Sequence, residues 1–157
     1  GKSREEVLRI LSQRSRDNGR TPLCWDDRAY NGFSTAEPWI AASSRIPQAT
    51  VQAETTDPDS ILNYYKKLLK LRKSSPALLK GTITFAYSEY GTVIAYQRTL
   101  EAEKKWILCN MAKTPVTLTL NGPVGKILLQ NRDSILIQDN TLTLRAFEAI
   151  VYEEENT

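Results

Sequence analysis

Regularly spaced strand-like segments fill the sequence after Gly81, and they constrain the fold most. Short runs rich in Val, Ile, Thr and aromatic residues alternate with turn residues, for example at 89–91, 121–123 and 139–140. About eight such runs can be read: 82–87, 92–97, 106–110, 116–120, 126–129, 134–137, 141–144 and 147–152. Several short strands at this spacing are typical of an antiparallel sandwich. The predicted fold class is therefore mainly β, with an antiparallel β-sandwich of about eight strands at the carboxyl end.

Two helices are expected before the sandwich. Ser3 and Glu6 form a capping-box pattern, and apolar residues follow at helical spacing, which predicts a helix from about Arg4 to Ser15. Asp57, with a proline directly behind it, marks the start of a second helix, and 74–76 marks its end. The long loop between them, about 16–57, has many helix breakers and little periodicity. A loop of that length indicates either function or a missing partner. We expect two domains, residues 1–79 and 80–157.

Composition excludes several classes of function. The net charge of +3 is spread along the chain, and the lysines late in the second helix oppose the helix dipole, so no nucleic-acid partner is expected. No apolar run is long enough to predict a membrane span, and the first residues lead into an amphipathic helix instead of the apolar core of a signal peptide. Without any histidine, the chain has no His-based triad and no His metal site. Cys24 and Cys109 lack metal spacing and are expected to be free thiols in a reducing cytoplasm; no metal or cofactor is predicted.

The most distinctive polar segment is SRDNGRTPLCWD, residues 15–26. Gly19 and Pro22 interrupt helix and strand alike, so the segment is expected to form an ordered loop. Arginine forks, amide groups and a flat indole together suit a polar, ring-shaped ligand such as a sugar. The alternative is a well-bonded connector in which Arg16 and Asp17 form a local ion pair.

This segment, followed by NGFSTAEPWI at residues 31–40, resembles the region after the last barrel strand in the alpha-amylase superfamily. The resemblance is strongest to the branch of oligo-1,6-glucosidase, dextran glucosidase and trehalose-6-phosphate hydrolase, and within it to the last. Leu23 and Cys24 depart from the pattern, since Met-Gln is usual there. The resemblance implies that residues 1–79 are the C-terminal remnant of a (β/α)8 barrel, with the last loop excursion and the eighth helix. It further implies that the chain is the C-terminal portion of a larger retaining alpha-glucosidase.

The resemblance also assigns site residues. Arg20 matches an arginine that recognises the terminal glucose through a hydroxyl, and Arg16, Asp17 and Asn18 would fix its rotamer. Retaining glycosidases need two carboxyl groups about 5 Å apart. Such groups precede this region in the family, and no catalytic residue is assigned here. The adjacent Asp26 and Asp27 are expected to cap turns.

The chain alone is therefore expected to be inactive. Its expected partners are the missing catalytic barrel of the same polypeptide and an alpha-glucoside substrate, which is trehalose 6-phosphate or a short isomalto- or malto-oligosaccharide. The alternative is a free-standing carbohydrate-binding or structural interaction module. Such a module would expose aromatic residues on one sheet face, and the candidates are Tyr87, Tyr90, Tyr96 and Trp106. Aromatic strand residues more often lie in the core or pair across strands, which favours a structural role for the sandwich.

Overall fold

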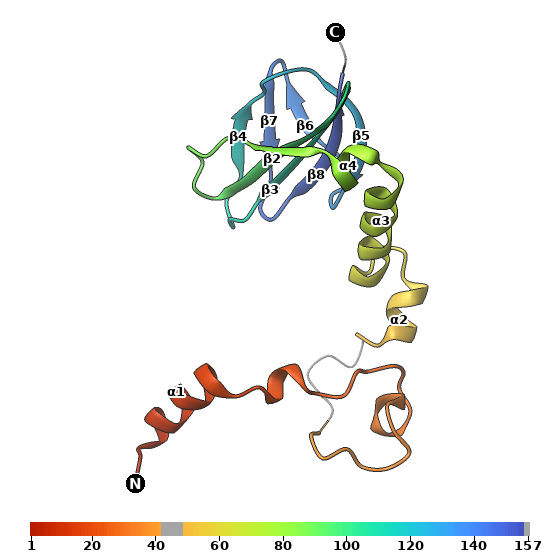
Figure 1. The fold of residues 1–157 in the computed structure, drawn as a ribbon. Coiled ribbons are helices and arrows are strands. Elements are labelled where there is room, and N and C mark those ends of the chain that lie inside the picture. Colours follow the sequence, from red (N-terminus) through yellow and green to blue (C-terminus); the bar gives the residue numbers. More distant parts are fainter. Residues whose placement is uncertain (42–48, 156–157) are drawn as a thin grey trace. The chain divides into compact units, whose positions relative to one another are not determined.

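The computed structural model describes residues 1–41 and 49–155 (Figure 1). Of Asn18 it describes only the backbone. The chain divides into two compact units, Gly1–Asn63 and Tyr64–Thr157. The expected division between domains at residues 79 and 80 stays a prediction.

The first unit contains short helices joined by turns. Helix α1 spans Arg4–Arg14, and the side chain of its N-cap Ser3 accepts the Glu6 N–H at 3.2 Å, as the capping-box pattern predicts. Two 3₁₀ turns follow, η1 (Asp17–Gly19) and η2 (Ala29–Gly32), and then helix α2 (Val51–Thr56). Helix α2 was not expected from the sequence. Its N-cap is Thr50, whose side chain accepts the Ala53 N–H at 3.1 Å.

Helix α3 spans Ile61–Ser74 and begins later than expected. The prediction that Asp57 is its N-cap is wrong, because Asp57 caps the end of α2 and its carboxylate accepts the Asp59 N–H at 2.9 Å. Ser60 takes the capping role, since its hydroxyl accepts the Asn63 N–H at 3.1 Å. The helix ends at Ser74, within the predicted stop. A further short helix that was not predicted, α4 (Pro76–Lys80), follows directly.

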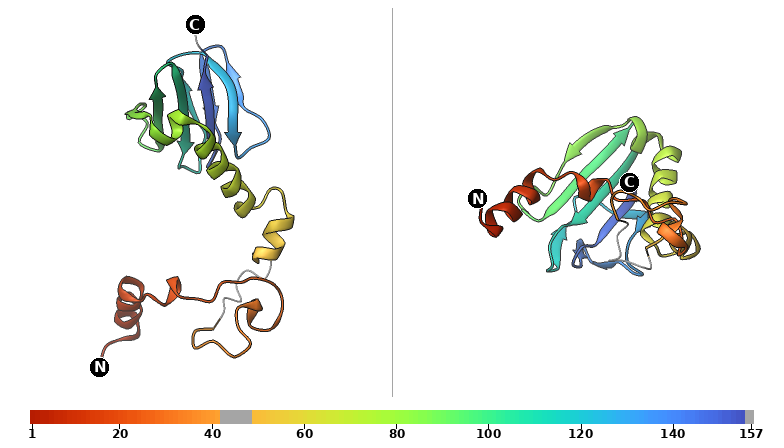
Figure 2. Two further views of the ribbon diagram at one scale, coloured as in Figure 1. Left: turned by 45° about the vertical axis from the view of Figure 1, so that its right-hand side comes forward. Right: turned by 90° about the horizontal axis from the view of Figure 1, so that it is seen from below.

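Among the described residues, eight antiparallel strands of the second unit form two sheets, which confirms the predicted sandwich (Figure 2). The larger sheet has the order β1-β2-β3-β8-β5, and the smaller sheet has the order β4-β7-β6. All six strand pairings are antiparallel. The strands are β1 (Thr82–Phe85), β2 (Val93–Leu100), β3 (Glu103–Asn110), β4 (Val116–Thr119), β5 (Val124–Gln130), β6 (Leu136–Gln138), β7 (Thr141–Leu144) and β8 (Ala149–Glu154).

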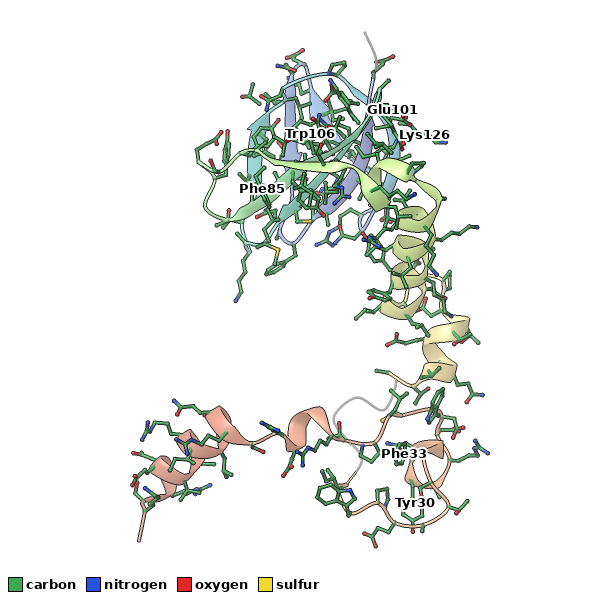
Figure 3. All side chains as sticks on the ribbon, in the orientation of Figure 1. Tyr30, Phe33, Phe85, Glu101, Trp106 and Lys126 are labelled. Carbon is green, nitrogen blue, oxygen red and sulfur yellow. The ribbon has the colours of Figure 1, made fainter. Side chains whose placement is uncertain are left out.

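The core of the sandwich is built from alternate residues of both sheets, because successive side chains of a strand point to opposite faces. Four leucines are completely buried. Leu108 belongs to the larger sheet, and Leu118, Leu142 and Leu144 belong to the smaller sheet. The Trp106 ring stacks on Tyr152 with centroids 6.4 Å apart and lies 5.9 Å from the Tyr87 ring. Figure 3 shows Trp106 among the strands, whereas Phe85 is exposed. Each fully buried leucine contributes roughly 1.5–3 kcal/mol through the hydrophobic effect.

Candidate functional site

The predicted site residues lie in one tight turn of the first unit. The Gly19 N–H donates to the Arg16 carbonyl and the Arg20 N–H to the Asp17 carbonyl, each at 3.0 Å. Ser15 closes the turn on the other side, since its hydroxyl accepts the Asp17 N–H at 3.3 Å. The structure thus brings the backbones of Arg16, Asp17 and Arg20 into one turn.

The side chains of this turn are largely free within the described part of the chain. Arg16, Asp17 and Arg20 are exposed. Among the described residues no ion pair joins Arg16 to Asp17. The alternative that the loop is only a connector stabilised by this pair is therefore not supported. The side chain of Asn18 lies outside what the structure describes. The sugar-binding role of Arg20 and the supporting role of its neighbours stay predictions.

A second group of contacts, which we call the Asp26 cluster (Asp26, Arg28, Asn31 and Gly32), follows directly along the chain. The single Nε–H of Arg28 is shared by both oxygens of the Asp26 carboxylate, each 3.0 Å from Nε, and Arg28 Nη2 donates to Oδ2 at 2.6 Å. Its Oδ1 also accepts the Arg28 backbone N–H at 3.0 Å, which confirms the expectation that Asp26 caps a turn. These hydrogen bonds from Arg28 lower the pKa of the Asp26 carboxyl below its ordinary value.

The backbone of the Asp26 cluster is left-handed over three consecutive residues. Tyr30, Asn31 and Gly32 have φ values of 54°, 56° and 66°. This turn presents the Asn31 carbonyl to two donors, the Trp25 N–H at 2.9 Å and the Asp26 N–H at 3.3 Å. A Cβ on Gly32 would lie 2.5 Å from Asp26 Oδ1, so only glycine fits at this position.

Hydrogen bonds join the two residues just before the cluster, Cys24 and Trp25, to helix α2. The Val51 N–H donates to the Cys24 carbonyl and the Gln52 N–H to the Trp25 carbonyl, each at 2.9 Å. The Asn31 side chain donates to Cys24 Sγ at 3.1 Å. Cys24 is one of the two positions at which the sequence departs from the family pattern, and its thiol contacts the left-handed turn through Asn31. Sequence reasoning did not predict this network, although the Asn-Gly pair that begins five residues after Asp26 is a readable signal for a left-handed turn.

The structure exposes four aromatic side chains of the same loop: Trp25, Tyr30, Phe33 and Trp39. Figure 3 shows Tyr30 and Phe33 on the loop. They help to line an open hollow of about 500 Å³, together with Arg28, Ala29, Gly32, Ser34 and Thr35. Aromatic faces beside polar groups are suited to contact with a sugar.

Within residues 1–41 and 49–155, no group of three His, Cys, Asp or Glu side chains could hold a metal ion. None of the helices in the same ranges has the length and apolar character needed to cross a membrane.

Comparison with known proteins decides the family. The family model "Alpha amylase, catalytic domain" matches residues 1–81, and "Alpha-amylase SusG C-terminal domain" matches residues 93–151. The chain belongs to the alpha-amylase family. This confirms the resemblance read from residues 15–26 and 31–40.

Relatives of this alpha-amylase family chain include an oligo-1,6-glucosidase of Bacillus cereus, with 31% identity over 98% of this chain. A trehalose-6-phosphate hydrolase of Bacillus subtilis is 30% identical over 97% of this chain. The crystal structure of Bacillus licheniformis trehalose-6-phosphate hydrolase matches with a TM-score of 0.88, 28% identity and 99% coverage of this chain. That of isomaltulose synthase from Klebsiella matches with a TM-score of 0.87, 31% identity and 98% coverage. The chain spans 28–29% of the length of these relatives, a share consistent with a C-terminal portion.

Proposed function

We propose that this chain is the C-terminal portion of a retaining alpha-glucosidase that cleaves trehalose 6-phosphate or short isomalto- or malto-oligosaccharides. The observation that carries the proposal is the match of residues 1–81 to the alpha-amylase catalytic domain, which includes the segment with Arg20. The relatives named as oligo-1,6-glucosidase and trehalose-6-phosphate hydrolase have nearly equal identities of 31% and 30%, so the proposal keeps both substrate classes.

In this proposal Arg20 recognises the terminal glucose. A guanidinium presents several donors in a rigid plane and can span two neighbouring hydroxyl groups, which the single ammonium of lysine does not reproduce. Arg20 is exposed at the end of a tight turn, and its side chain makes no hydrogen bond within the described residues. The two carboxyl groups that form and hydrolyse the glycosyl-enzyme intermediate would come from the catalytic barrel.

The catalytic barrel is also the proposed partner of helix α3. Ile61, Tyr65 and Leu69 follow one another at a spacing of four residues, and they are 81%, 57% and 39% exposed. Residues at that spacing lie on one side of a helix, so together they form an apolar stripe. We infer that this stripe packs on the barrel.

For the β-sandwich we propose a structural role. Tyr87 and Trp106, two of the four aromatic candidates for a sugar-binding face, are only 7% exposed, and Tyr90 and Tyr96 are half-buried. This weighs against the alternative of a free-standing carbohydrate-binding module. A cytoplasmic location, which fits the free Cys24 and Cys109 thiols, is part of the same proposal.

A comparison of activities tests the proposal. The pure 157-residue chain should not cleave nitrophenyl alpha-glucoside, whereas the protein that also contains the barrel should. Calorimetric titration of the chain with maltose, isomaltose or trehalose 6-phosphate should show no saturable binding. Measurable turnover by the chain alone would refute the assignment of the catalytic carboxylates to the barrel, and clear saturable binding would favour the binding module.

Replacement of Arg20 in the barrel-containing protein tests the assigned residue. Arg20→Ala should lower kcat/KM by about 100-fold or more with little change in Tm, because substrate positioning is lost while an exposed side chain is removed. Arg14→Ala, also an exposed arginine of the first unit, is the matched control and should leave kcat/KM unchanged. Activity of Arg20→Ala near that of the wild type would show that its assigned role is wrong.

A further inference from the structure

We propose that Asp26 is a positioning residue: the Asp26 cluster sets the course of the backbone that carries Arg20 toward the substrate. The inference rests on the proposed function. It adds a residue to which neither the family resemblance nor the comparisons assign a role.

The placement of the Arg20 side chain depends on the course of its backbone. Within the described residues its guanidinium has no hydrogen bond or ion pair that could fix its direction. The chain after it is fixed within a few residues, since Pro22 is buried and Cys24 is bonded through its carbonyl to the Val51 N–H. Four residues span at most about 14 Å, so the position of Cys24 limits where Arg20 can lie.

The Asp26 cluster holds Cys24 and Trp25 in place. The Asn31 side chain reaches Cys24 Sγ, and the Asn31 carbonyl accepts the Trp25 N–H. Asn31 makes both contacts from a left-handed conformation. Asparagine tolerates this conformation, but it is unfavourable for the neighbouring Tyr30 and persists there only when the surrounding structure holds it in place.

The Asp26 carboxylate holds this turn. Both of its oxygens accept the single Nε–H of Arg28, and it also accepts an Nη2–H of the same guanidinium and the Arg28 backbone N–H. Its oxygens also lie where a side chain on Gly32 would be, so the Gly32 backbone packs directly against them. Loss of the carboxylate charge would weaken the hydrogen bonds to the Arg28 guanidinium and so loosen the turn that follows.

The test uses the barrel-containing enzyme and nitrophenyl alpha-glucoside. Asp26→Asn keeps an acceptor for the Arg28 N–H but loses the charged pair, and it should lower kcat/KM by about 10- to 100-fold, since small displacements of a positioning group have effects of this size. Asp27→Asn is the matched control, because Asp27 is exposed and its carboxylate accepts no hydrogen bond from the described residues. It should behave as the wild type.

A double variant separates positioning from general destabilisation. If Asp26 acts through Arg20, the Arg20→Ala/Asp26→Asn enzyme should be no less active than Arg20→Ala alone. Losses that multiply, or an Asp26→Asn enzyme with wild-type kcat/KM, would overturn the proposal.

A second readout does not depend on activity. In the 157-residue chain, Asp26→Asn should speed hydrogen exchange at the amides of Trp25, Asp26, Val51 and Gln52 by at least about tenfold and leave Leu108 in the sandwich unchanged. Unchanged exchange at these four amides would refute the role of the cluster. If exchange changes as expected but the wild-type barrel-containing protein cleaves no alpha-glucoside, the proposed function is wrong while the structural role of Asp26 stands.

Discussion

At the scale of single residues, Glu154 shows how one carboxylate can join three strand residues. It accepts hydrogen bonds from Trp106 Nε1 and Gln97 Nε2, both at 2.7 Å, and from Lys104 Nζ at 2.8 Å. Burial alone would raise the pKa of Glu154. The hydrogen bonds from Lys104, Trp106 and Gln97, together with the positive charge of Lys104, outweigh this effect and lower the pKa. The folded state therefore favours the ionised carboxylate.

The first prediction follows from this lowered pKa. Because the unfolded chain binds the proton more readily, Glu154 stabilises the fold above the pKa of the unfolded state, and this contribution is lost as pH falls through the folded-state pKa. Urea unfolding of the wild type should show a falling free energy between about pH 5 and pH 3, with a smaller fall in Glu154→Gln. An identical pH dependence of the two proteins would contradict the prediction.

Removal of the carboxylate gives the second prediction. Glu154→Ala leaves the Trp106 N–H without its acceptor in a buried position, so the free energy of unfolding at pH 7 should fall by about 1–3 kcal/mol. Glu155→Ala is the matched control, because Glu155 is exposed and adjacent, and its effect should stay within about 0.5 kcal/mol. Equal effects of the two variants in urea unfolding would refute the role of Glu154.

Residues differ in how far their roles can be predicted from the sequence. Arg20 was singled out because it lies in a segment whose spacing resembles a known family, and its role stays a prediction. The contact between Asp26 and Gly32 was not found, because it depends on three successive left-handed residues that bring the chain back on itself. The N-cap of α3 was predicted at Asp57, but it is Ser60. Aspartate and serine both favour helix starts, and only the position at which α2 ends, with Asp57 as its C-cap, decides between them.

At the scale of elements, helix α4 is fixed to strand β3 by its N-cap. The Ser75 hydroxyl accepts the Leu78 N–H at 3.2 Å and donates to Glu103 Oε1 at 2.7 Å. Glu103 Oε2 accepts the Ala77 N–H at 3.3 Å, so a carboxylate from the sheet completes the first turn of the helix.

The third prediction concerns this cap. Ser75→Ala should lower the free energy of unfolding by about 0.5–2 kcal/mol, because the N-cap acceptor and the bond to Glu103 are both lost. Ser74→Ala removes an exposed hydroxyl that only donates to the Leu71 carbonyl, and it should change stability by less than about 0.5 kcal/mol. Urea unfolding of the two variants measures the difference. A larger effect at Ser74 than at Ser75 would show that the cap is misassigned.

The strands were predicted more reliably than the short helices. All eight predicted runs correspond to strands, because alternation and turn residues are local signals. β3 begins at Glu103, earlier than predicted, and its first residue pairs with Leu100 of β2. In this stretch Lys105 is buried and paired with Glu103 at 3.2 Å and Glu153 at 2.7 Å. Charged residues in a strand give no local signal of this pairing. α2 and α4 are too short for helical periodicity, although Ser75-Pro76 is a readable N-cap signal.

At the scale of the whole molecule, the two units differ in how much they bury. Among the described residues of the first unit, only Pro22, Thr50 and Ser60 are buried. The second unit has a continuous apolar core with four completely buried leucines, including Leu108 and Leu142. Since apolar burial is the main favourable term in folding, most of the stability of this chain resides in the sandwich.

The fourth prediction is that the units open with different free energies. Brief thermolysin treatment of the 157-residue chain should cut within residues 1–63 first and leave a fragment that contains Gly81–Glu154, because proteases cut segments that open at little cost. Mass spectrometry identifies the fragments. Leu142→Ala should make the sandwich susceptible, because it creates a cavity and lowers the free energy of unfolding by about 2–5 kcal/mol. Leu136→Ala, in the neighbouring strand β6 but with its side chain exposed, should leave the fragment resistant. If thermolysin cut the wild-type sandwich as fast as it cuts residues 1–63, the stability would be shared between the two units. The buried core leucines would then not account for the stability of the chain.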